Sequence, residues 1–455
     1  MTVSILCKAG KKNVLLMKDD NSRDGHVENT HGIPKKGKKK RGPGPRIKTL
    51  FFLWFPEGSE RQAISLVSTM LLWTTAFLAS LVAAQTYPPD VVDQLAAASL
   101  PKVKEWLAKN PQGNCTLETA VRRKEWMDLT LAQRKEYTNA VLCLMSKPAL
   151  TSSAAPGAKS RFDDYIVVHV QQTPRNHGSV RVYTSNTYPV LISNPYADLL
   201  LTLAPLLRMA LRASPSQRVW IQGISTDPAN SPLFDGSEGS MGGNGAKASY
   251  NGIMIPGPYD RIPPADGGGC VTTGPFKNMT VNLGPIAPIL QLTRNPRADG
   301  LGYNPRCLRR DINKNSAAVT SAKDVYDVIT KNNDAHWFQT VMEGQFPQGK
   351  WGIHAGGHYT VGGDPGGDFY TSPGDPAFWL HHTMIDRVWW IWQIQNLEKR
   401  LKEVSHTRTM SNFPPSANGT LDDLSGLGVL APDVEVRELM STMGGLMGKF
   451  CYIYE

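Results

Sequence analysis

The chain has 455 residues, of which 41% are hydrophobic and 19% charged, a composition typical of a globular protein and not of a disordered or fibrous one. Its formal net charge is +10, but residues 1–69 contain 14 Lys and Arg against 6 Asp and Glu, so +8 of that charge lies in this stretch. The rest of the chain is nearly neutral, which leaves no electrostatic case for a nucleic-acid partner.

An apolar segment follows the basic stretch. Residues 70–84 have an apolar centre and small residues at Val82 and Ala84, the pattern of a secretory signal peptide cleaved after Ala84. Because a signal peptide stands at the true N-terminus, we interpret residues 1–69 as a spurious, basic and disordered extension from gene prediction. The alternative is a signal anchor, since residues 63–84 are just long enough to span a bilayer.

The remaining chain, residues 85–455, has further features of a secreted glycoprotein. Asn114, Asn278 and Asn418 each begin an N-glycosylation sequon. Five cysteines follow residue 70, an odd number in a chain expected to form disulfides outside the cell. We therefore expect an extracellular protein with no stable membrane association.

Apolar periodicity and turn residues predict a mainly α-helical core joined by long irregular loops, which are usually functional or held by disulfides. The predicted segments are an apolar stretch over 86–112 interrupted at Pro101 and Pro111, two helices beginning near Thr116 and Thr130, a loop over 147–160, a Gly- and Pro-rich stretch with little helix over 226–310, helix over 323–345, a Trp-rich helix over 376–402, and loop with short helix over 406–435.

The sequence GIHAGGH holds the first candidate metal ligands. His354 and His358 are four residues apart, so on a helix they lie on one face and close enough to bind one ion. The same spacing also occurs by chance in helices without a metal. The two glycines between the histidines favour close packing of another segment against this helix.

A second cluster lies in GDPAFWLHHTMIDRVWWIWQ, residues 374–393. His382 and Asp386 are again four residues apart, and a carboxylate often orients a metal-bound imidazole. Three histidines without a cysteine or carboxylate ligand suit copper or zinc. For Trp389, Trp390 and Trp392 we expect core packing, beside the site, and no redox role.

This second stretch resembles the copper B signature of the tyrosinase family, which includes catechol oxidases and haemocyanins. It matches the pattern D-P-x-F-W-x-x-H-x-x-x-D at every defined position. The resemblance implies that His354, His358 and His382 bind copper B and that His381 is a non-ligand neighbour. Asp386 is then expected to orient the bound imidazole of His382 without binding the metal itself. It extends from about Asn114 to Glu455.

The resemblance also implies a fold and a domain plan. The family fold is a four-helix-bundle core around a dinuclear copper site, with long Gly- and Pro-rich loops. The chain is similar to the short secreted fungal tyrosinases. Its ending, Tyr452-Ile453-Tyr454, resembles the tyrosine motif that closes the central domain, so we expect no inhibitory C-terminal domain.

Copper A is incomplete in this sequence. His169 resembles the first family ligand and His177 the second, but the position nine residues after His177, where the family has the histidine of a Trp-His-Arg motif, is Asn186. No Trp-His-Arg occurs in the chain. Copper A therefore has at most two ligands as the chain is written.

The genetic code offers an explanation for the missing ligand. Residues 203–223 can be coded so that reading begins one nucleotide later and gives WHRYFVWLYEQALRNECGYR, which resembles the family at copper A and supplies a sixth cysteine. A retained intron from Val180 into Asp198 would shift the frame by the required amount. We interpret residues 180–223 as intron-derived and out-of-frame sequence; the alternative is a genuine, diverged loop.

The resemblance implies a two-copper oxidase that converts o-diphenols to o-quinones with O2. Hydroxylation of monophenols is less expected, because Ala355 stands where an Asn is associated with that activity in the family. Two other classes stay open: an oxygen carrier with the same metals, and a single-copper or inactive paralogue built on His354, His358 and His382. The partners expected are a small phenolic substrate and O2.

Overall fold

The computed structural model describes residues 90–176, 226–254, 261–444 and 450–455. Four sequence interpretations fall outside these ranges: the extension over 1–69, the signal peptide over 70–84, the copper A candidate His177, and the out-of-frame stretch over 180–223. No helix among the described residues is long and apolar enough to cross a bilayer.

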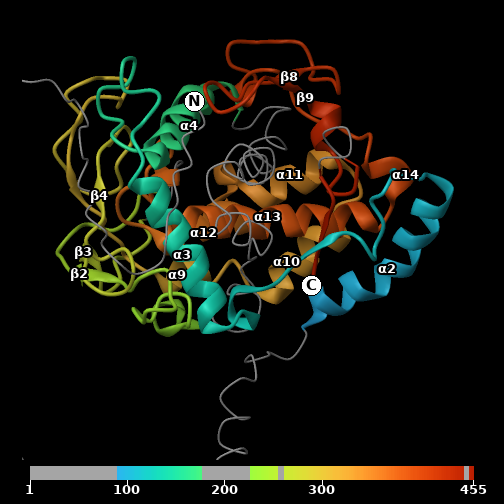
Figure 1. Ribbon diagram of the computed structural model, residues 1–455, viewed down its shortest axis with the longest axis horizontal. Coiled ribbons are helices and arrows are strands. Elements are labelled where there is room, and N and C mark those ends of the chain that lie inside the picture. Colours follow the sequence, from blue (N-terminus) through green and yellow to red (C-terminus); the bar gives the residue numbers. More distant parts are fainter. Residues whose placement is uncertain (1–89, 177–225, 255–260, 445–449) are drawn as a thin grey trace, which may run out of the picture. The chain divides into compact units, whose positions relative to one another are not determined.

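The described chain is mainly helical, as predicted, and its strands are short. Figure 1 shows α13 crossing the middle of the described helices, with α10 and α12 beside it. The α-helices are α2 (Val91–Lys109), α3 (Leu131–Met145), α4 (Arg161–Asn176), α9 (Lys314–Ala317), α10 (Ala322–Lys331), α11 (Ala335–Glu343), α12 (Ile353–Val361), α13 (Ala377–Ile394) and α14 (Leu397–Arg400).

The strands form five two-stranded sheets among the described residues. They are β1 (Val121–Arg123), β2 (Gly245–Lys247), β3 (Gly268–Val271), β4 (Thr280–Val281), β5 (Arg306–Cys307), β6 (Gly344–Gln345), β7 (Lys350–Trp351), β8 (Leu424–Ser425), β9 (Val434–Glu435) and β10 (Tyr452–Tyr454). Only β1 and β10 pair in parallel, and they join segments from the two ends of the described chain.

The predicted interruption at Pro101 is wrong, because α2 continues through this residue. A proline inside a helix costs about 3 kcal/mol through a lost hydrogen bond and a steric clash. In α2 that cost is offset by burial of one helix face, which includes Val92, Ala96 and Val103 and packs against α10 and α13. Tertiary packing thus overrides the local preference.

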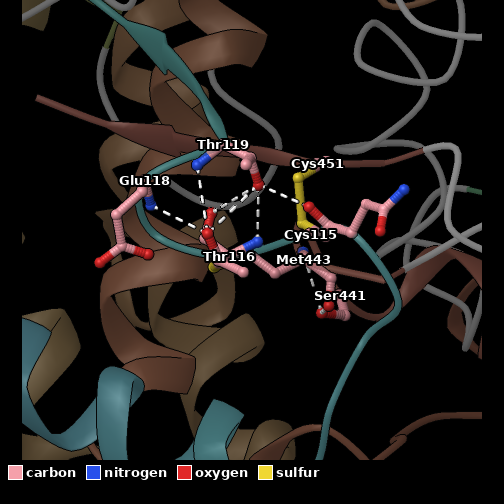
Figure 2. Close-up of a disulfide and its surroundings, with 8 residues drawn as sticks. Cys115, Thr116, Glu118, Thr119, Ser441, Met443 and Cys451 are labelled. Carbon is pink, nitrogen blue, oxygen red and sulfur yellow. Dashed lines mark hydrogen bonds between the residues drawn. A yellow bond between two sulfur atoms is a disulfide. The ribbon is translucent and has the colours of Figure 1, made fainter.

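The helix predicted near Thr116 is also wrong, whereas the one after Thr130 is confirmed as α3. The segment after Thr116 instead forms β1, whose residues pair with β10. A disulfide between Cys115 and Cys451 fixes these two segments side by side, 336 residues apart in sequence (Figure 2). The β-strand therefore depends on a partner that no local window of the sequence contains.

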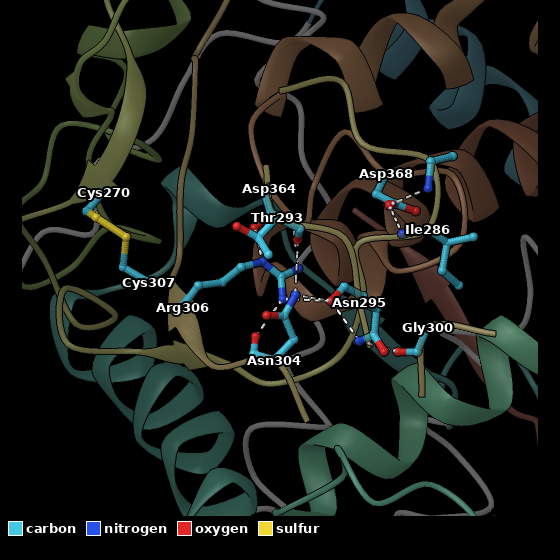
Figure 3. A network of polar contacts seen from close by, with 12 residues as sticks. Cys270, Ile286, Thr293, Asn295, Gly300, Asn304, Arg306, Cys307, Asp364 and Asp368 are labelled. Atoms are coloured by element: carbon cyan, nitrogen blue, oxygen red, sulfur yellow. Dashed lines mark hydrogen bonds and ion pairs between the residues drawn. A yellow bond between two sulfur atoms is a disulfide. The ribbon is translucent and has the colours of Figure 1, made fainter. Parts of the chain in front are cut away.

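The stretch over 226–310 has little helix, as predicted, and is held by covalent and polar contacts. The Cys270–Cys307 disulfide joins β3 to β5. Next to it, the guanidinium of Arg306 binds both carboxylate oxygens of Asp364, at 2.5 and 2.9 Å (Figure 3). A two-point contact of this kind fixes orientation as well as distance.

The loop that precedes α13 is anchored to the same region. The carboxylate of Asp368 accepts the backbone N–H groups of Ile286 and Ala287, at 2.7 and 2.8 Å (Figure 3). Its other oxygen accepts the N–H of Tyr370 at 2.9 Å. These bonds connect the helix-poor stretch to the loop that leads into α13.

The start of α13 is set by a buried ion pair. Asp375 accepts the backbone N–H of Ala377 at 2.8 Å and binds the guanidinium of Arg310 at 2.7 and 2.8 Å. Both charged side chains are fully buried. The Asp-Pro step before the paired histidines thus fixes where α13 begins.

Candidate metal centre

Two helices bring four histidines together. α12 carries His354 and His358, and α13 carries His381 and His382. Suitable ring nitrogens of all four lie within 4.8 Å of one another. Gly357 permits this approach, because a Cβ atom on it would lie 2.1 Å from the His381 ring. The close packing expected from the glycines is present.

Three of the four imidazoles point one nitrogen at a common centre. The Nε2 atoms of His354, His358 and His382 are 3.2, 3.1 and 3.5 Å apart in the three pairwise combinations. Nitrogens about 2.0–2.1 Å from one ion in tetrahedral geometry stand about 3.3–3.4 Å apart. The triangle of nitrogens therefore fits a single transition-metal ion.

The surroundings of His382 favour the same interpretation. Burial, with further effects from His354 and His358, lowers the pKa of His382 well below its usual value. A neutral imidazole at this position has a lone pair for a metal, and a set of histidine ligands suits zinc or copper. Without an ion among them, the Nε2 atoms of His354, His358 and His382 would bring nitrogen lone pairs close together.

His381 has a different task. Its Nε2 donates to the backbone carbonyl oxygen of His354 at 3.0 Å. Burial lowers its pKa to about 3. The bond joins α13 to the first turn of α12, so His381 holds the two helices in register.

Glu343 supports the site without belonging to any sequence motif. This residue ends α11, and its Oε2 accepts a hydrogen bond from Nδ1 of His354 at 2.6 Å. With Nδ1 protonated, the lone pair of His354 lies on Nε2, which faces the other histidines. The only sequence signal is an acidic residue that ends a helix shortly before the first histidine, which is too common to identify the contact.

His169 lies on α4 and shares the neighbour Phe378 with the candidate ligands His358 and His382. The Phe378 ring stacks on His382 at 4.0 Å and meets His169 edge-on at 5.6 Å. Nδ1 of His169 donates to the carbonyl oxygen of Tyr370 at 2.7 Å, which leaves Nε2 as its acceptor nitrogen. His177, the second copper A candidate, lies outside the described residues.

Asp386 does not have the predicted neighbour. Its hydrogen bonds among the described residues come from the hydroxyls of Tyr452 and Tyr454, and Arg123 lies 3.9 Å away. Nδ1 of His382 has no hydrogen-bond partner in the described structure. The i,i+4 spacing is present, but β10 brings two hydroxyls to the carboxylate, so Asp386 anchors the C-terminal strand.

The ionisation of Asp386 should make stability depend on pH. Burial raises its pKa to about 6, against the effects of Arg123 and the two tyrosines. A raised carboxyl pKa contributes stability that is fully present below pH 3.8 and lost as the pH rises through about 6. In Asp386→Asn this loss is absent, so its free energy of unfolding relative to wild type should increase by up to about 3 kcal/mol over that range.

Denaturant unfolding at several pH values measures this difference. Asp235→Asn, the same change at an exposed position, controls for the loss of a charge. A difference between Asp386→Asn and wild type that stays constant across the range would contradict the prediction.

The three tryptophans of α13 belong to the core, as expected. Trp389 and Trp392 stack at 4.9 Å, and Phe338 of α11 packs on both. Trp390 lies against Tyr454 at the C-terminal strand. Phe378, near the start of the same helix, contacts the candidate metal ligands His169, His358 and His382.

The chain is similar to known proteins of one family. A family model described as the common central domain of tyrosinase matches residues 220–395, a range that includes both helices with the four histidines. The chain is 32% identical to the tyrosinase-like protein orsC of Emericella nidulans, over 71% of this chain and 87% of that protein. It is 33% identical to tyrosinase P of Aspergillus terreus, over 73% and 91%.

A solved structure is similar as well. It is a point mutant of a polyphenol oxidase from Thermothelomyces thermophila, with 37% sequence identity and a TM-score of 0.72. The match covers 81% of this chain and 99% of that one. The helical core in which the four histidines lie is therefore the fold of a polyphenol oxidase.

Proposed function

This chain belongs to the tyrosinase family of copper oxidoreductases, and from that premise we propose that it oxidises o-diphenols to o-quinones with O2. The observation that carries the proposal is the triangle of Nε2 atoms from His354, His358 and His382, with edges of 3.1–3.5 Å. We assign these three residues as the ligands of copper B.

Copper bound by imidazoles can cycle between two oxidation states and leave positions open for O2 and substrate. Other side chains of the protein hold the copper ligands in position. Glu343 holds the tautomer of His354, and His381 fixes the position of α12 against α13. Phe378 covers one face of His382 and keeps water from that side. These contacts hold the ligands rigidly in place, as a metal site requires.

We assign His169 and His177 to copper A. The bond from His169 Nδ1 to the carbonyl oxygen of Tyr370 places the lone pair of this imidazole on Nε2, the nitrogen that would bind the metal. Asp368 supports this contact by binding the N–H of Tyr370. In the printed chain copper A still lacks a third histidine, so we infer that the functional protein has a different sequence between Ser179 and residue 224.

Two forms of the chain test both assignments. One is the printed sequence, and the other carries the frame-corrected segment with Trp-His-Arg. We expect about one copper per chain and negligible catechol oxidation for the first, and two coppers with turnover for the second. Sequencing of cDNA across codons 165–230 shows which form is transcribed.

Each outcome decides one point. Two coppers in the printed chain would overturn the proposed loss of copper A and the interpretation of residues 180–223. Two coppers without catechol turnover in the corrected chain would favour the oxygen carrier. No copper in either form would overturn the assignment of His354, His358 and His382.

The type of substrate follows from the position after His354. Ala355 offers no hydrogen bond to a water or to a phenolic hydroxyl, whereas an Asn there is associated with monophenol hydroxylation in the family. We therefore propose an o-diphenol oxidase with little activity on monophenols. Comparing catechol with phenol in the corrected chain, before and after Ala355→Asn, measures this preference.

We also propose that the protein is secreted. The support is the signal-like segment over 70–84, the three sequons and two disulfides between described residues, Cys115–Cys451 and Cys270–Cys307. Disulfides form and persist in oxidising compartments. Detection of the processed, glycosylated protein outside the cell would support this location, and purely cytosolic protein would oppose it.

A further inference from the structure

The proposed copper A ligand His169 is held by a carbonyl group from a distant loop. Its Nδ1 donates to the carbonyl oxygen of Tyr370 at 2.7 Å, across 201 residues of sequence. His169 is 5% exposed, and Tyr370 lies in the loop between α12 and α13. The orientation of this imidazole therefore depends on what fixes the peptide group that contains the Tyr370 carbonyl.

Asp368 holds the other side of the same peptide group. The peptide between Tyr370 and Thr371 directs its carbonyl to His169 and donates its N–H to Oδ1 of Asp368 at 3.2 Å. The N–H of Tyr370 donates to the same oxygen at 2.9 Å. A trans peptide is planar, with its C=O and N–H on opposite sides, so fixing the N–H also fixes the direction of the carbonyl. Asp368 thus sets where the acceptor for His169 lies.

The second oxygen of Asp368 connects this peptide to the helix-poor stretch. Oδ2 accepts the N–H groups of Ile286 and Ala287 at 2.7 and 2.8 Å (Figure 3). Asp368 is 1% exposed, so water does not compete for these bonds. Gly284 has a φ of 69°, and a Cβ atom on it would lie 2.8 Å from the methyl carbon of Thr371. The two segments therefore meet at close range, with no room for a side chain at Gly284.

Arg306 holds this turn from another side. Its guanidinium binds both carboxylate oxygens of Asp364 and donates from Nη1 to the carbonyl oxygen of Gly284 at 3.1 Å. The same carbonyl oxygen accepts the side-chain amides of Asn295 and Asn304 at 2.9 and 3.0 Å (Figure 3). A connected set of bonds thus runs from Arg306, through the turn that begins at Gly284, to the loop before α13.

We propose that Asp368 is a positioning residue for copper A, and that Arg306 supports copper A through it. The inference rests on the assignment of His169 as a copper A ligand made above. With the Tyr370 carbonyl fixed, the imidazole is held with Nε2 in one direction, and a ligand held in this way binds its metal more tightly. When Asp368 no longer holds the peptide, the carbonyl can turn and His169 loses its orientation.

The ring of His169 reports this effect without metal or turnover. In the metal-free full chain with isotope-labelled histidine, nuclear magnetic resonance distinguishes an imidazole protonated at Nδ1 from one protonated at Nε2. His169→Gln identifies the signal, which should show Nδ1–H in wild type. In Asp368→Asn an amide NH₂ group meets two of the backbone N–H donors, so His169 should shift toward Nε2–H. Arg297→Gln, which removes an exposed ion pair of the same stretch, should leave the signal unchanged.

Copper binding measures the consequence. In the frame-corrected chain, competition with a chelator gives the affinity for each copper, and His169→Gln identifies copper A. Asp368→Asn should weaken copper A by about tenfold and leave copper B unchanged. Arg306→Lys keeps the charge but loses the two-point contact, so it should weaken copper A less. The double variant should bind copper A as Asp368→Asn does, because Arg306 acts through Asp368.

A shifted His169 signal with selective weakening of copper A supports the proposal. An unchanged signal in Asp368→Asn, equal weakening of both coppers, or additive losses in the double variant would overturn it. Thermal unfolding verifies that each variant is folded, and Arg306→Lys, the milder change, carries the test if Asp368→Asn does not fold. If His169→Gln keeps copper A, the ligand assignment fails; if it loses copper A while Asp368→Asn behaves as wild type, only this inference fails.

Discussion

Replacing His382 with glutamine is expected to lower the affinity of the four-histidine cluster for copper by about 100-fold or more. Removing a residue that hydrogen-bonds to a metal ligand typically lowers metal affinity by about 10–100-fold. Removing the ligand itself should lower the affinity at least as much. The Nε2 of His382 is 3.1 Å from that of His358 and 3.5 Å from that of His354, so it forms one corner of the proposed site.

His381→Gln is the matched control. His381 is adjacent in sequence, equally buried, and part of the same four-histidine cluster. Its Nε2 donates to a carbonyl oxygen, a role that a glutamine amide can also fill. We expect this variant to retain copper, measured by chelator competition and by metal content of the purified chain. Loss of copper in His381→Gln together with retention in His382→Gln would reverse the assignment.

Removal of the Cys115–Cys451 disulfide is expected to have the largest effect on folding. The bond closes a loop of 336 residues, and in the chain-entropy account a crosslink of this span stabilises by about 6 kcal/mol. It also holds β1 beside β10, which brings Tyr452 and Tyr454 to the buried carboxylate of Asp386. The double variant Cys115→Ser/Cys451→Ser should therefore lose both constraints.

Cys270→Ser/Cys307→Ser is the comparison, since that disulfide spans only 37 residues and its loop entropy corresponds to about 4 kcal/mol. Denaturant unfolding of the metal-free chains measures both losses. We expect the first double variant to be the less stable, with increased exposure of tyrosine to solvent. A smaller loss in the first variant than in the second would show that β10 stays in place without its covalent link.

The residues that share a helix face could be predicted from the sequence. His354 and His358 are four residues apart, which places them on one face of a helix, and His382 lies in a motif specific enough to indicate the family. Local periodicity and turn residues also predicted the Trp-rich helix and the helix-poor stretch that precedes it. These features depend on interactions within a few residues, so a short window of sequence contains the information.

The contacts between distant segments were decided by the tertiary structure. Asp386 has the spacing of a partner for His382 but binds two tyrosines, because β10 is brought back to α13. Glu343 has no motif and still bonds His354, because α11 and α12 pack together.

The secondary-structure errors have the same origin. Pro101 stays inside a helix because one face of α2 is buried against α10 and α13. β1 forms because its parallel partner β10 arrives from the other end of the described chain. The sequence by itself determined the family and the candidate histidines, because the signature that contains them is local. Only packing decided which side chain supports each ligand, because burial and hydrogen bonding between distant segments outweigh local preference.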